Sequence, residues 1–289
     1  MNALSLRLNL RQIVWVIAFL AVLAFLFWPT FLWMVERFQA HDSYYSHGWL
    51  VPPASAWLVW QRRESLQQLN KGADYWGLCL MVPCVALHLM AAWLQINFVS
   101  GFSLLGVVAG LVWILWGKEV LWHLRMPLAF LIFMIPLPGD WLINISFNMK
   151  LFAAAMATQL LNLMRIPALQ EGSTIHVPGL SVIVDDTCSG LRSLISLVAL
   201  AALWSALLPA KTLRRQKALI MVAAVPIALV ANMVRILILV LLGAMYGSEA
   251  ADSFIHYGSG IVVFGVALLI LAWLSHGVQR WFNIDTPQQ

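Results

Sequence analysis

The residue best suited to covalent chemistry in this chain is Cys188, which lies in residues 186–192 (DTCSGLR). The nucleophilic form of cysteine is the thiolate, and a free thiol has a pKa of about 8.5. A cap at Thr187 or Asp186 would begin a helix here and leave Cys188 in its first turn, where the helix dipole favours an anion. Arg192 follows one turn later on the same face, where it can pair with the thiolate or with a substrate carboxylate.

Two interpretations of Cys188 stay open. Asp185 and Asp186 raise the pKa of a nearby thiol and therefore oppose the helix dipole. A cysteine beside a helix cap can also be a buried structural residue, because free cysteine packs as a small hydrophobe. The other cysteines, Cys79 and Cys84, lie five residues apart in an apolar run, which is neither a CxxC nor a zinc spacing. We expect those two to be packing residues.

A second polar feature is Arg235, which interrupts the apolar run 225–242 (VPIALVANMVRILILVLL). It lies about ten residues from the predicted outer end of a spanning helix, or roughly 15 Å at helical rise. An arginine at that depth is costly to insert and marks a functional site by default. Asn232, one turn earlier, offers a hydrogen-bond partner. The alternative is a structural salt bridge between helices, for example to Asp186.

His256 opens the last apolar segment, in the sequence HYGSG, after a short acidic loop. Because its side chain titrates near neutrality, it can serve as an acid, a base or a hydrogen-bond donor. A single histidine at a membrane interface can equally be a wet surface residue, so its role depends on its neighbours. The other six histidines show no HxxxH or HExxH pattern. We therefore expect neither a metal site nor a cofactor.

The elements that must position these residues are membrane helices. Of the 289 residues, 62% are hydrophobic and 10% are charged, against roughly a quarter charged in soluble domains. The net charge of +5 is spread over short loops, which indicates topology in a membrane and not nucleic-acid binding. The composition predicts an all-α polytopic membrane protein with a single domain, 1–289, and no separate soluble domain.

A helix needs about 20 mostly apolar residues to cross a membrane. Eight segments approach or reach this length: 12–35, 48–61 (the shortest), 75–94, 98–116, 119–138, 188–209, 218–245 and 257–277. Lys and Arg collect before the first segment, in alternate loops and after the last. This predicts about eight spans with both termini in the cytoplasm. Cys188, Arg235 and His256 then fall on the outer, periplasmic side.

Residues 138–187 must then begin and end outside the cytoplasm. Residues 141–164 look helical but carry five Asn, Gln and Lys side chains, which are expensive in lipid. We predict an interfacial or re-entrant helix, with a span that lines the bundle interior as the alternative. Residues 173–184 (STIHVPGLSVIV) contain two β-prone runs around Pro178 and Gly179, which predicts a small extracytoplasmic hairpin before Cys188. The active-site half of the domain is therefore 138–277.

Together these residues resemble the exosortase/archaeosortase family of membrane cysteine transpeptidases. The resemblance rests on four segments: 186–192 (DTCSGLR), 232–235 (NMVR), 256–260 (HYGSG) and 44–51 (YYSHGWLV). The last of these looks like the family's outer loop after its first helix. The four segments extend over nearly the whole chain, and their combination is specific, whereas CSGLR alone would be weak.

The resemblance implies an enzyme that cleaves proteins with a C-terminal sorting signal: a short Pro-Glu-Pro-type motif, a transmembrane helix and a basic tail. It implies that Cys188 forms an acyl-thioester, that Arg235 donates a proton and that His256 stabilises the transition state. From the chemistry alone we would assign proton transfer to His256 and charge stabilisation to Arg235, because a guanidinium holds its proton tightly. Both assignments stay open.

Four further residues are weaker candidates for binding the substrate. Arg192, or alternatively the region of His47, is expected to hold the glutamate of the motif. Asp186 lies in the same segment as Arg192, and Asn232 lies in the segment of Arg235. The partners of the protein would be membrane-anchored substrate proteins that carry the sorting signal, together with the lipid bilayer, and not nucleic acid.

The leading hypothesis is a thiol protease and transpeptidase of the bacterial inner membrane, which serves surface sorting or export linked to extracellular polysaccharide. The alternative is a transporter or polysaccharide-export component in which Arg235 binds an anionic substrate. Many transporters show internal symmetry, and none is visible in this sequence. A non-catalytic assembly scaffold is a third hypothesis. The enzyme needs both Cys188 and Arg235, the transporter needs only Arg235, and the scaffold needs neither.

Overall fold

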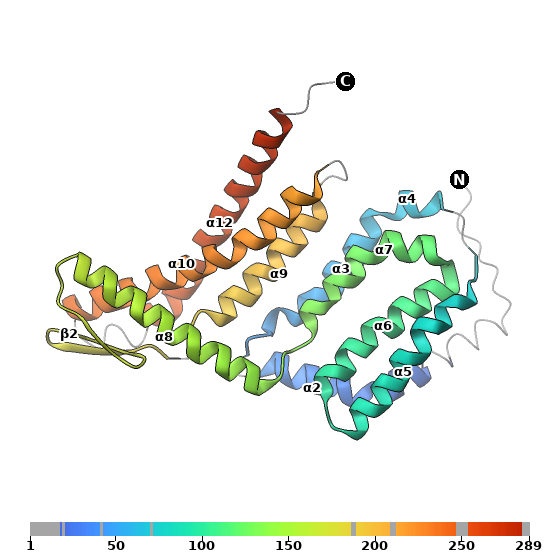
Figure 1. The fold of residues 1–289 in the computed structure, drawn as a ribbon, viewed down its shortest axis with the longest axis horizontal. Coiled ribbons are helices and arrows are strands. Elements are labelled where there is room, and N and C mark those ends of the chain that lie inside the picture. The colour runs from blue at the N-terminus through green and yellow to red at the C-terminus, as the bar shows by residue number, and fades with distance from the viewer. Residues whose placement is uncertain are drawn as a thin grey trace. The chain divides into compact units, whose positions relative to one another are not determined.

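The computed structural model describes residues 18, 21–40, 43–69, 72–185, 189–208, 212–246 and 254–284, with side chains at all of these except 246, 254–259, 261 and 279–284. The chain is mainly α-helical, as its composition predicts, and it contains one small antiparallel sheet (Figure 1). Its contacts divide it into two compact units. The first unit is Met1–Ala40 with Ser65–Arg125, and the second is His41–Glu64 with Met126–Gln289. The organisation as a single functional domain stays a prediction.

The first unit is built on a close pair of helices. It contains α2 (Trp28–Gln39), η2 (Tyr75–Gly77), α5 (Leu78–Trp93), α6 (Asn97–Trp116) and the first part of α7 (Lys118–Phe130). α5 and α6 lie side by side (Figure 1). A Cβ on Gly106 would clash with the Sγ of Cys84, and a Cβ on Gly110 would lie 2.8 Å from that of Met81. Glycines on α6 therefore let the two helices approach closely, and Cys84 packs in their contact.

A buried polar network ties α2 to this pair. Nδ1 of His88 lies 2.7 Å from Oγ of Ser100, and Nε2 lies 3.1 Å from the carbonyl oxygen of Leu26. Because a carbonyl only accepts, Nε2 carries the proton and Ser100 donates to Nδ1. The Thr30 hydroxyl bonds to the same serine. His88, which is 2% exposed, is therefore a satisfied structural histidine.

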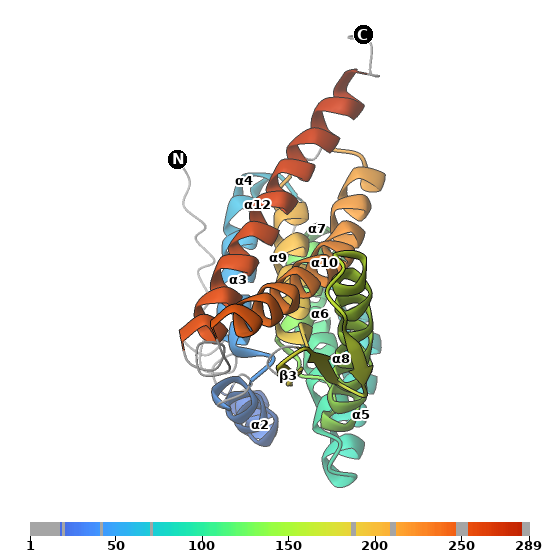
Figure 2. The same ribbon diagram turned by 90° about the vertical axis from the view of Figure 1, so that its left-hand side faces the viewer.

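The second unit is arranged around one long helix. Its elements are η1 (Ser46–Leu50), α3 (Val51–Gln61), η3 (Leu131–Met134), α8 (Gly139–Leu163), α9 (Leu191–Leu207), α10 (Arg214–Tyr246) and α12 (Phe254–Ile284). The boundary between the two units falls inside the short helix α4 (Arg63–Gln67), after Glu64. α10 packs against α8, α9 and α12 (Figures 1 and 2). Small residues such as Ala201, Ala224 and Ala228 line its contact with α9 and α12. This packing brings segments distant in the sequence next to α10.

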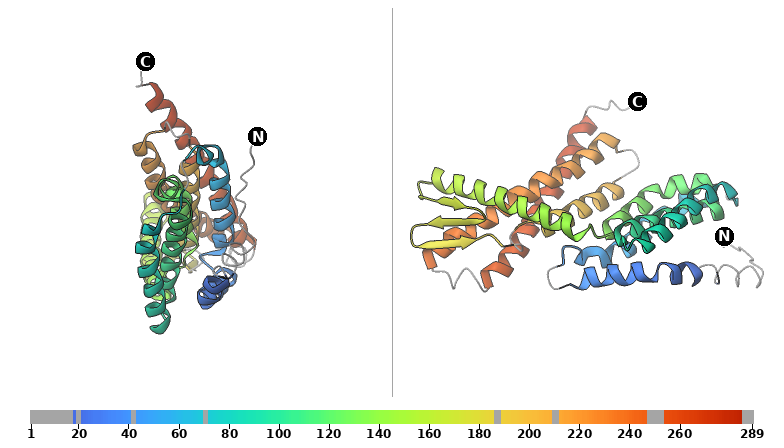
Figure 3. Two further views of the ribbon diagram at one scale, coloured as in Figure 1. Left: turned by 90° about the vertical axis from the view of Figure 1, so that its right-hand side faces the viewer. Right: turned by 60° about the horizontal axis from the view of Figure 1, so that its bottom comes forward.

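A three-stranded antiparallel sheet follows α8. Its order is β1 (Leu169–Glu171), β2 (Thr174–Val177) and β3 (Leu180–Ile183), so β1 is one strand more than the hairpin that the sequence predicts. β2 and β3 are joined through Pro178 and Gly179, and the glycine has a φ of +81°. Figure 3 shows the strands lying along α8. The sheet connects α8 to the segment that contains Cys188.

One face of the sheet is packed and the other is exposed. The packed face contributes Ile175 and Val177 to a core that includes Leu161 of α8 and Ile236 and Val240 of α10. The burial of the strand residues alternates along all three strands, as expected when a sheet covers helices with one face only. The sheet is thereby held on α8 and α10.

Within the described ranges, three helices are long and apolar enough to cross a membrane: Tyr75–Trp93, Asn97–Trp116 and Arg214–Met245. Leu191–Leu207 and Val262–Val278 are apolar but shorter. Large side chains stay exposed on these helices, for example Trp93 at 82% and Trp273 at 76%, as expected of positions that face lipid. The count of eight spans stays a prediction, because 12–35 lies partly outside the described residues and 48–61 forms only η1 and the 11-residue α3.

The connection between α7 and α8 is sharply bent. Lys118–Met134 and Gly139–Leu163 are together long and apolar enough to form a span, but their axes differ by 81°. α8 itself runs for 25 residues, and its Asn148 and Asn162 bond to the backbone carbonyls of Asn144 and Ala168. The bend fits a broken span or a re-entrant segment, so both interpretations of residues 141–164 stay open.

Candidate active site

All four segments that the sequence singles out belong to the second unit. Arg235 lies in α10, His256 lies in the first turn of α12, and residues 44–51 lie in and around η1. Cys188 and Asp186 lie outside the described residues, and so does the side chain of His256. The described part of the site therefore consists of the residues that follow Cys188, of Arg235 and of their neighbours.

The segment that follows Cys188 is pressed against the helix that carries Arg235. Gly190 has a φ of +78°, and a Cβ at this position would lie 2.5 Å from Cγ and 2.8 Å from Nδ2 of Asn232. Real Cβ contacts are never this short, so only glycine fits here. Asn232 is 5% exposed and Ser189 is fully buried. The motifs CSGLR and NMVR are therefore in direct contact.

The structure corrects the predicted start of α9. The helix begins at Leu191, and its N-cap is Gly190, which makes no side-chain capping hydrogen bond. The predicted helix start at residue 188 is therefore three residues too early, and the predicted caps, Asp186 and Thr187, lie with Cys188 outside the described residues. The physical reason is the left-handed conformation of Gly190, which ends the helical path. Ser189 satisfies one free amide instead, since its Oγ accepts from the N–H of Leu191 at 3.3 Å.

The guanidinium of Arg235 lies against the backbone of α12. A Cβ on Gly260 would lie 3.6 Å from Cζ of Arg235 and 3.7 Å and 3.8 Å from its two terminal nitrogens. Gly260 is the last residue of the HYGSG segment. His256 precedes it by four residues, one helical turn. The segments NMVR and HYGSG are thus also in contact, and the glycine leaves space for the guanidinium.

A small cavity lies between α9, α10 and α12 beside Arg235. Its volume is about 30 Å³, and its polar lining comes from Ser193, Asn232 and Arg235, while Gly260 and apolar residues complete the wall. A cavity of this size holds a water molecule and not a peptide. Ser193 also donates from its Oγ to the carbonyl of Gly190 at 2.9 Å, which stabilises the start of α9. This polar space is where three of the motif segments meet.

The fourth segment reaches α9 through His47. Its Nδ1 lies 3.4 Å from Oγ of Ser196, and its ring stacks on Tyr45 with 5.7 Å between the centroids. Its Nε2 is buried and meets no hydrogen-bond geometry with the described residues. Burial lowers the pKa of His47, and the nearby carbonyl of Phe133 opposes this in part. Tyr45 is held in turn, since its Oη accepts from the N–H of Leu137 at 3.2 Å.

The weaker candidates differ in where they lie. His47 is half-buried beside Ser196 in the second turn of α9, and it does not line the cavity. Arg192 is half-buried in the first turn of α9, and Asn232 lines the cavity. Within the described ranges no three His, Cys, Asp or Glu residues are grouped as metal ligands would be. The start of α9 is therefore surrounded by two cationic side chains, those of Arg192 and Arg235, and by several serine hydroxyl groups.

The family model for the transmembrane exosortase (Exosortase_EpsH) matches residues 15–273 of the chain. The chain belongs to this family. No curated protein and no solved structure matches it. Exosortases are membrane transpeptidases for sorting signals and generally use a cysteine. The match covers all four motif segments.

Sequence reasoning missed several neighbours that shape this exosortase site. Gly190 and Gly260 were noticed only as letters of their motifs, although each faces a polar side chain of α10. The signal that could have found them is the chemistry of glycine itself, since it occurs where backbones approach closely. Ser193 and Ser196 gave no signal at all, because serine is common in membrane helices and their roles depend on which helix lies opposite.

Proposed function

We propose that this exosortase is a membrane-embedded cysteine transpeptidase that cleaves its substrates at a Pro-Glu-Pro-type sorting signal through an acyl-thioester on Cys188. The observation that supports it most is the pair of glycine contacts on α10: Gly190 against Asn232, and Gly260 against Arg235. Cys188 precedes Gly190 by two residues and His256 precedes Gly260 by one turn. The three proposed catalytic residues therefore belong to segments that meet on one helix.

In the first step the Sγ of Cys188 attacks the carbonyl carbon of the scissile peptide bond. A tetrahedral intermediate forms, and the C–N bond then breaks to leave the acyl group on sulfur. The departing amine takes up a proton as it leaves. An acceptor nucleophile, such as water or an amine, later attacks the thioester and the thiolate departs. The product is the substrate protein freed from its C-terminal helix.

Arg235 would stabilise the negative charge that develops on the carbonyl oxygen. Its guanidinium lies beside Gly260 and lines a small cavity between three helices, where a fixed positive charge acts more strongly than in bulk water. Because a guanidinium holds its proton tightly, we assign the proton transfer to His256. The opposite division, with Arg235 as proton donor and His256 as stabiliser, is the one that the family resemblance implies.

Arg192, His47, Asn232 and Asp186 would take part in substrate binding. Arg192 would pair with the glutamate of the motif, because a guanidinium binds a carboxylate through two parallel hydrogen bonds. The site would face the periplasm of the inner membrane, on the side opposite the Lys- and Arg-rich loops. The substrates would be membrane-anchored proteins sorted to the surface together with extracellular polysaccharide.

The test is to co-express a protein that carries a C-terminal sorting signal with wild-type enzyme or with Cys188→Ala, and to analyse it by mass spectrometry. We expect a shortened C-terminus with wild type and an intact one with the variant, at equal levels of inserted enzyme. A thioester on Cys188, trapped by acid quench and released by hydroxylamine, would identify the intermediate. Normal processing by Cys188→Ala would refute the proposal, and loss of function in Arg235 variants alone would favour a transporter.

A further inference from the structure

The edge strand of the small sheet has backbone groups that point away from the sheet. The N–H of Val184 bonds to the carbonyl of Ser173 at 2.9 Å, which sets the phase of the ladder between β2 and β3. Since successive residues of a strand point their backbone groups to opposite sides, Val182 also faces β2. The N–H and C=O groups of Ser181 and Ile183 consequently face outward from the edge.

The described residues of this edge are exposed and include none of the features that usually block an edge strand. Ser181 is exposed and Ile183 is 63% exposed. Natural edge strands are usually blocked by a Lys, a Pro or a bulge, and the β3 sequence, LSVI, contains no Lys or Pro. Among the described residues, β3 pairs with β2 only. The other outer strand, β1, lies against α8, where the side-chain amide of Gln170 donates to the carbonyl of Leu151 at 3.3 Å.

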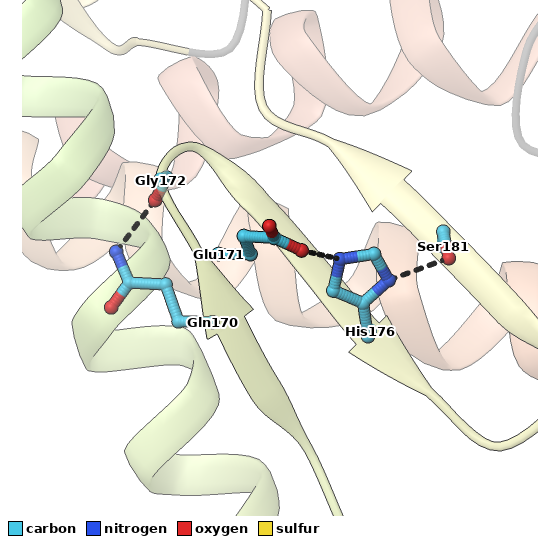
Figure 4. Close-up of polar contacts among 5 residues, drawn as sticks. All are labelled: Gln170, Glu171, Gly172, His176 and Ser181. Carbon is cyan, nitrogen blue, oxygen red and sulfur yellow. Dashed lines mark hydrogen bonds and ion pairs between the residues drawn. The ribbon is translucent and has the colours of Figure 1, made fainter.

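The strand is held firmly in its place. On the exposed face His176 bridges to both neighbouring strands, with Nδ1 2.8 Å from Oγ of Ser181 and Nε2 3.4 Å from Oε2 of Glu171 (Figure 4). On the packed face the sheet contacts Ile236, which is 1% exposed. Ile236 directly follows Arg235 in α10. The edge is therefore a preformed template fixed to the same helix as the proposed catalytic arginine.

The edge also lies close to Cys188 along the chain. Ile183 precedes Cys188 by five residues, a stretch of at most roughly 17 Å. A substrate segment that pairs with β3 needs only a few further residues to reach the start of α9. A strand that delivers a peptide in extended form suits this reaction, because an extended backbone exposes its carbonyl carbons to attack.

We propose that the outer edge of β3 binds the Pro-Glu-Pro-type segment of the sorting signal as an added β-strand. This inference rests on the proposed function. Strand addition to a free edge is a common mode of peptide recognition, in which backbone hydrogen bonds supply affinity. The backbone groups of Ser181 and Ile183 would form those bonds. The scissile bond would lie just outside the paired segment, at the end nearer to Cys188.

The pattern of two prolines around one other residue fits an edge strand. Alternate residues of the added strand turn their backbone groups toward β3 and toward solvent. Proline has no N–H, and it is tolerated in sheets where that position faces solvent. In Pro-Glu-Pro the two prolines share one side, so the glutamate alone presents both its N–H and its C=O to Ser181 or Ile183. Every backbone donor that is present can then find a partner.

Disulfide cross-linking tests this placement. Enzyme with Cys79→Ala, Cys84→Ala and Cys188→Ser would receive one new cysteine, Ser181→Cys or Ile183→Cys, and would be oxidised with substrates that carry single cysteines along the sorting signal. We expect cross-links at every second substrate position, because side chains of a paired strand alternate between faces. Equal cross-linking at consecutive positions, or none, would overturn the inference. A cross-link between two enzyme molecules that persists with substrate present would also overturn it.

Substitutions in the substrate provide a second, matched test. Replacing the central glutamate by proline removes the one N–H that faces β3, whereas replacing it by glutamine keeps that N–H. We expect the proline variant to lose cross-linking and the glutamine variant to retain its two-residue period. In the enzyme, Ser181→Pro should reduce processing about tenfold more than Ser181→Ala, which keeps the amide. Equal effects of the two members of either pair would contradict strand addition.

The two proposals fail in different ways. If wild-type enzyme forms a thioester on Cys188 but the edge variants and the proline substrate behave like their matched controls, strand addition is wrong and the transpeptidase stands. If no processing and no thioester occur with wild type, the proposed function is wrong and strand addition falls with it. Expression and detergent-stable folding of each variant would be measured first, and the cross-linking result does not depend on turnover.

Discussion

Gly190 at the start of α9 packs against Asn232 of α10 so closely that a Cβ on the glycine would lie 2.5 Å from the amide carbon of the asparagine. This contact joins the segment that carries Cys188 to the helix that carries Arg235. Both residues are buried. The close approach of the start of α9 to α10 therefore depends on the absence of a side chain at residue 190.

Gly190→Ala should destabilise the protein and reduce its activity. The φ of +78° strains an alanine, and its Cβ would also clash with Asn232, so the free energy of unfolding should fall by about 2 kcal/mol or more. Gly172→Ala is the matched control, because Gly172 has a φ of +60° and open space around it. Thermal unfolding in detergent measures both. An equal loss in the two variants would show that the clash contributes nothing.

Gly260 should tolerate a small side chain better than a large one. An alanine Cβ would lie 3.6 Å from Cζ of Arg235, an ordinary contact, while leucine would fill the space of the guanidinium. We expect Gly260→Ala to fold at least as well as wild type, since alanine favours helix, and Gly260→Leu to lose much more activity. Processing rates and unfolding temperatures would be compared. Equal activity of the two variants would place the guanidinium elsewhere during the reaction.

Arg235→Gln should slow the acylation step with little effect on substrate affinity. Loss of a charged group that stabilises an oxyanion lowers rates by about 100-fold to 1,000-fold. Arg235→Lys keeps the charge but not the planar fork, and should retain an intermediate rate. The measurement is the single-turnover rate of thioester formation on Cys188. If Arg235→Gln acylates at the wild-type rate, the arginine does not stabilise the transition state.

His47 should make the stability of the protein depend on pH. Its pKa in the folded protein is lowered from 6.5 because burial disfavours the charged ring. The unfolded chain therefore binds a proton first as the pH falls, and stability is lost from about pH 6.5 downward until the folded pKa is reached. His47→Gln should flatten this dependence, whereas His123→Gln, at an exposed position, serves as the control. If stability depends on pH in the same way in His47→Gln as in wild type, folding does not lower the pKa of His47.

The membrane class and the grouping of the motif segments could be predicted from the sequence. The composition and the lengths of the apolar runs indicate that the helices lie in a membrane. Charged residues inside such runs are rare, so Arg235 is conspicuous. The start of α9 could not be predicted in the same way. Residues 186–187 are good caps by type, but α9 begins at Leu191, after Gly190, which packs against Asn232, a residue 42 positions later in the chain.

What the sequence determined by itself is therefore the chemistry on offer: a cysteine, an arginine within an apolar helix, a histidine at a helix start, and a β-prone segment before the cysteine. These are local properties of residue type and order. Only the tertiary structure decided that Gly190 and Gly260 both contact α10, that the sheet has a third strand, and that β3 pairs with β2 alone among the described residues. Such contacts join residues far apart in the chain, and packing, not local preference, selects them.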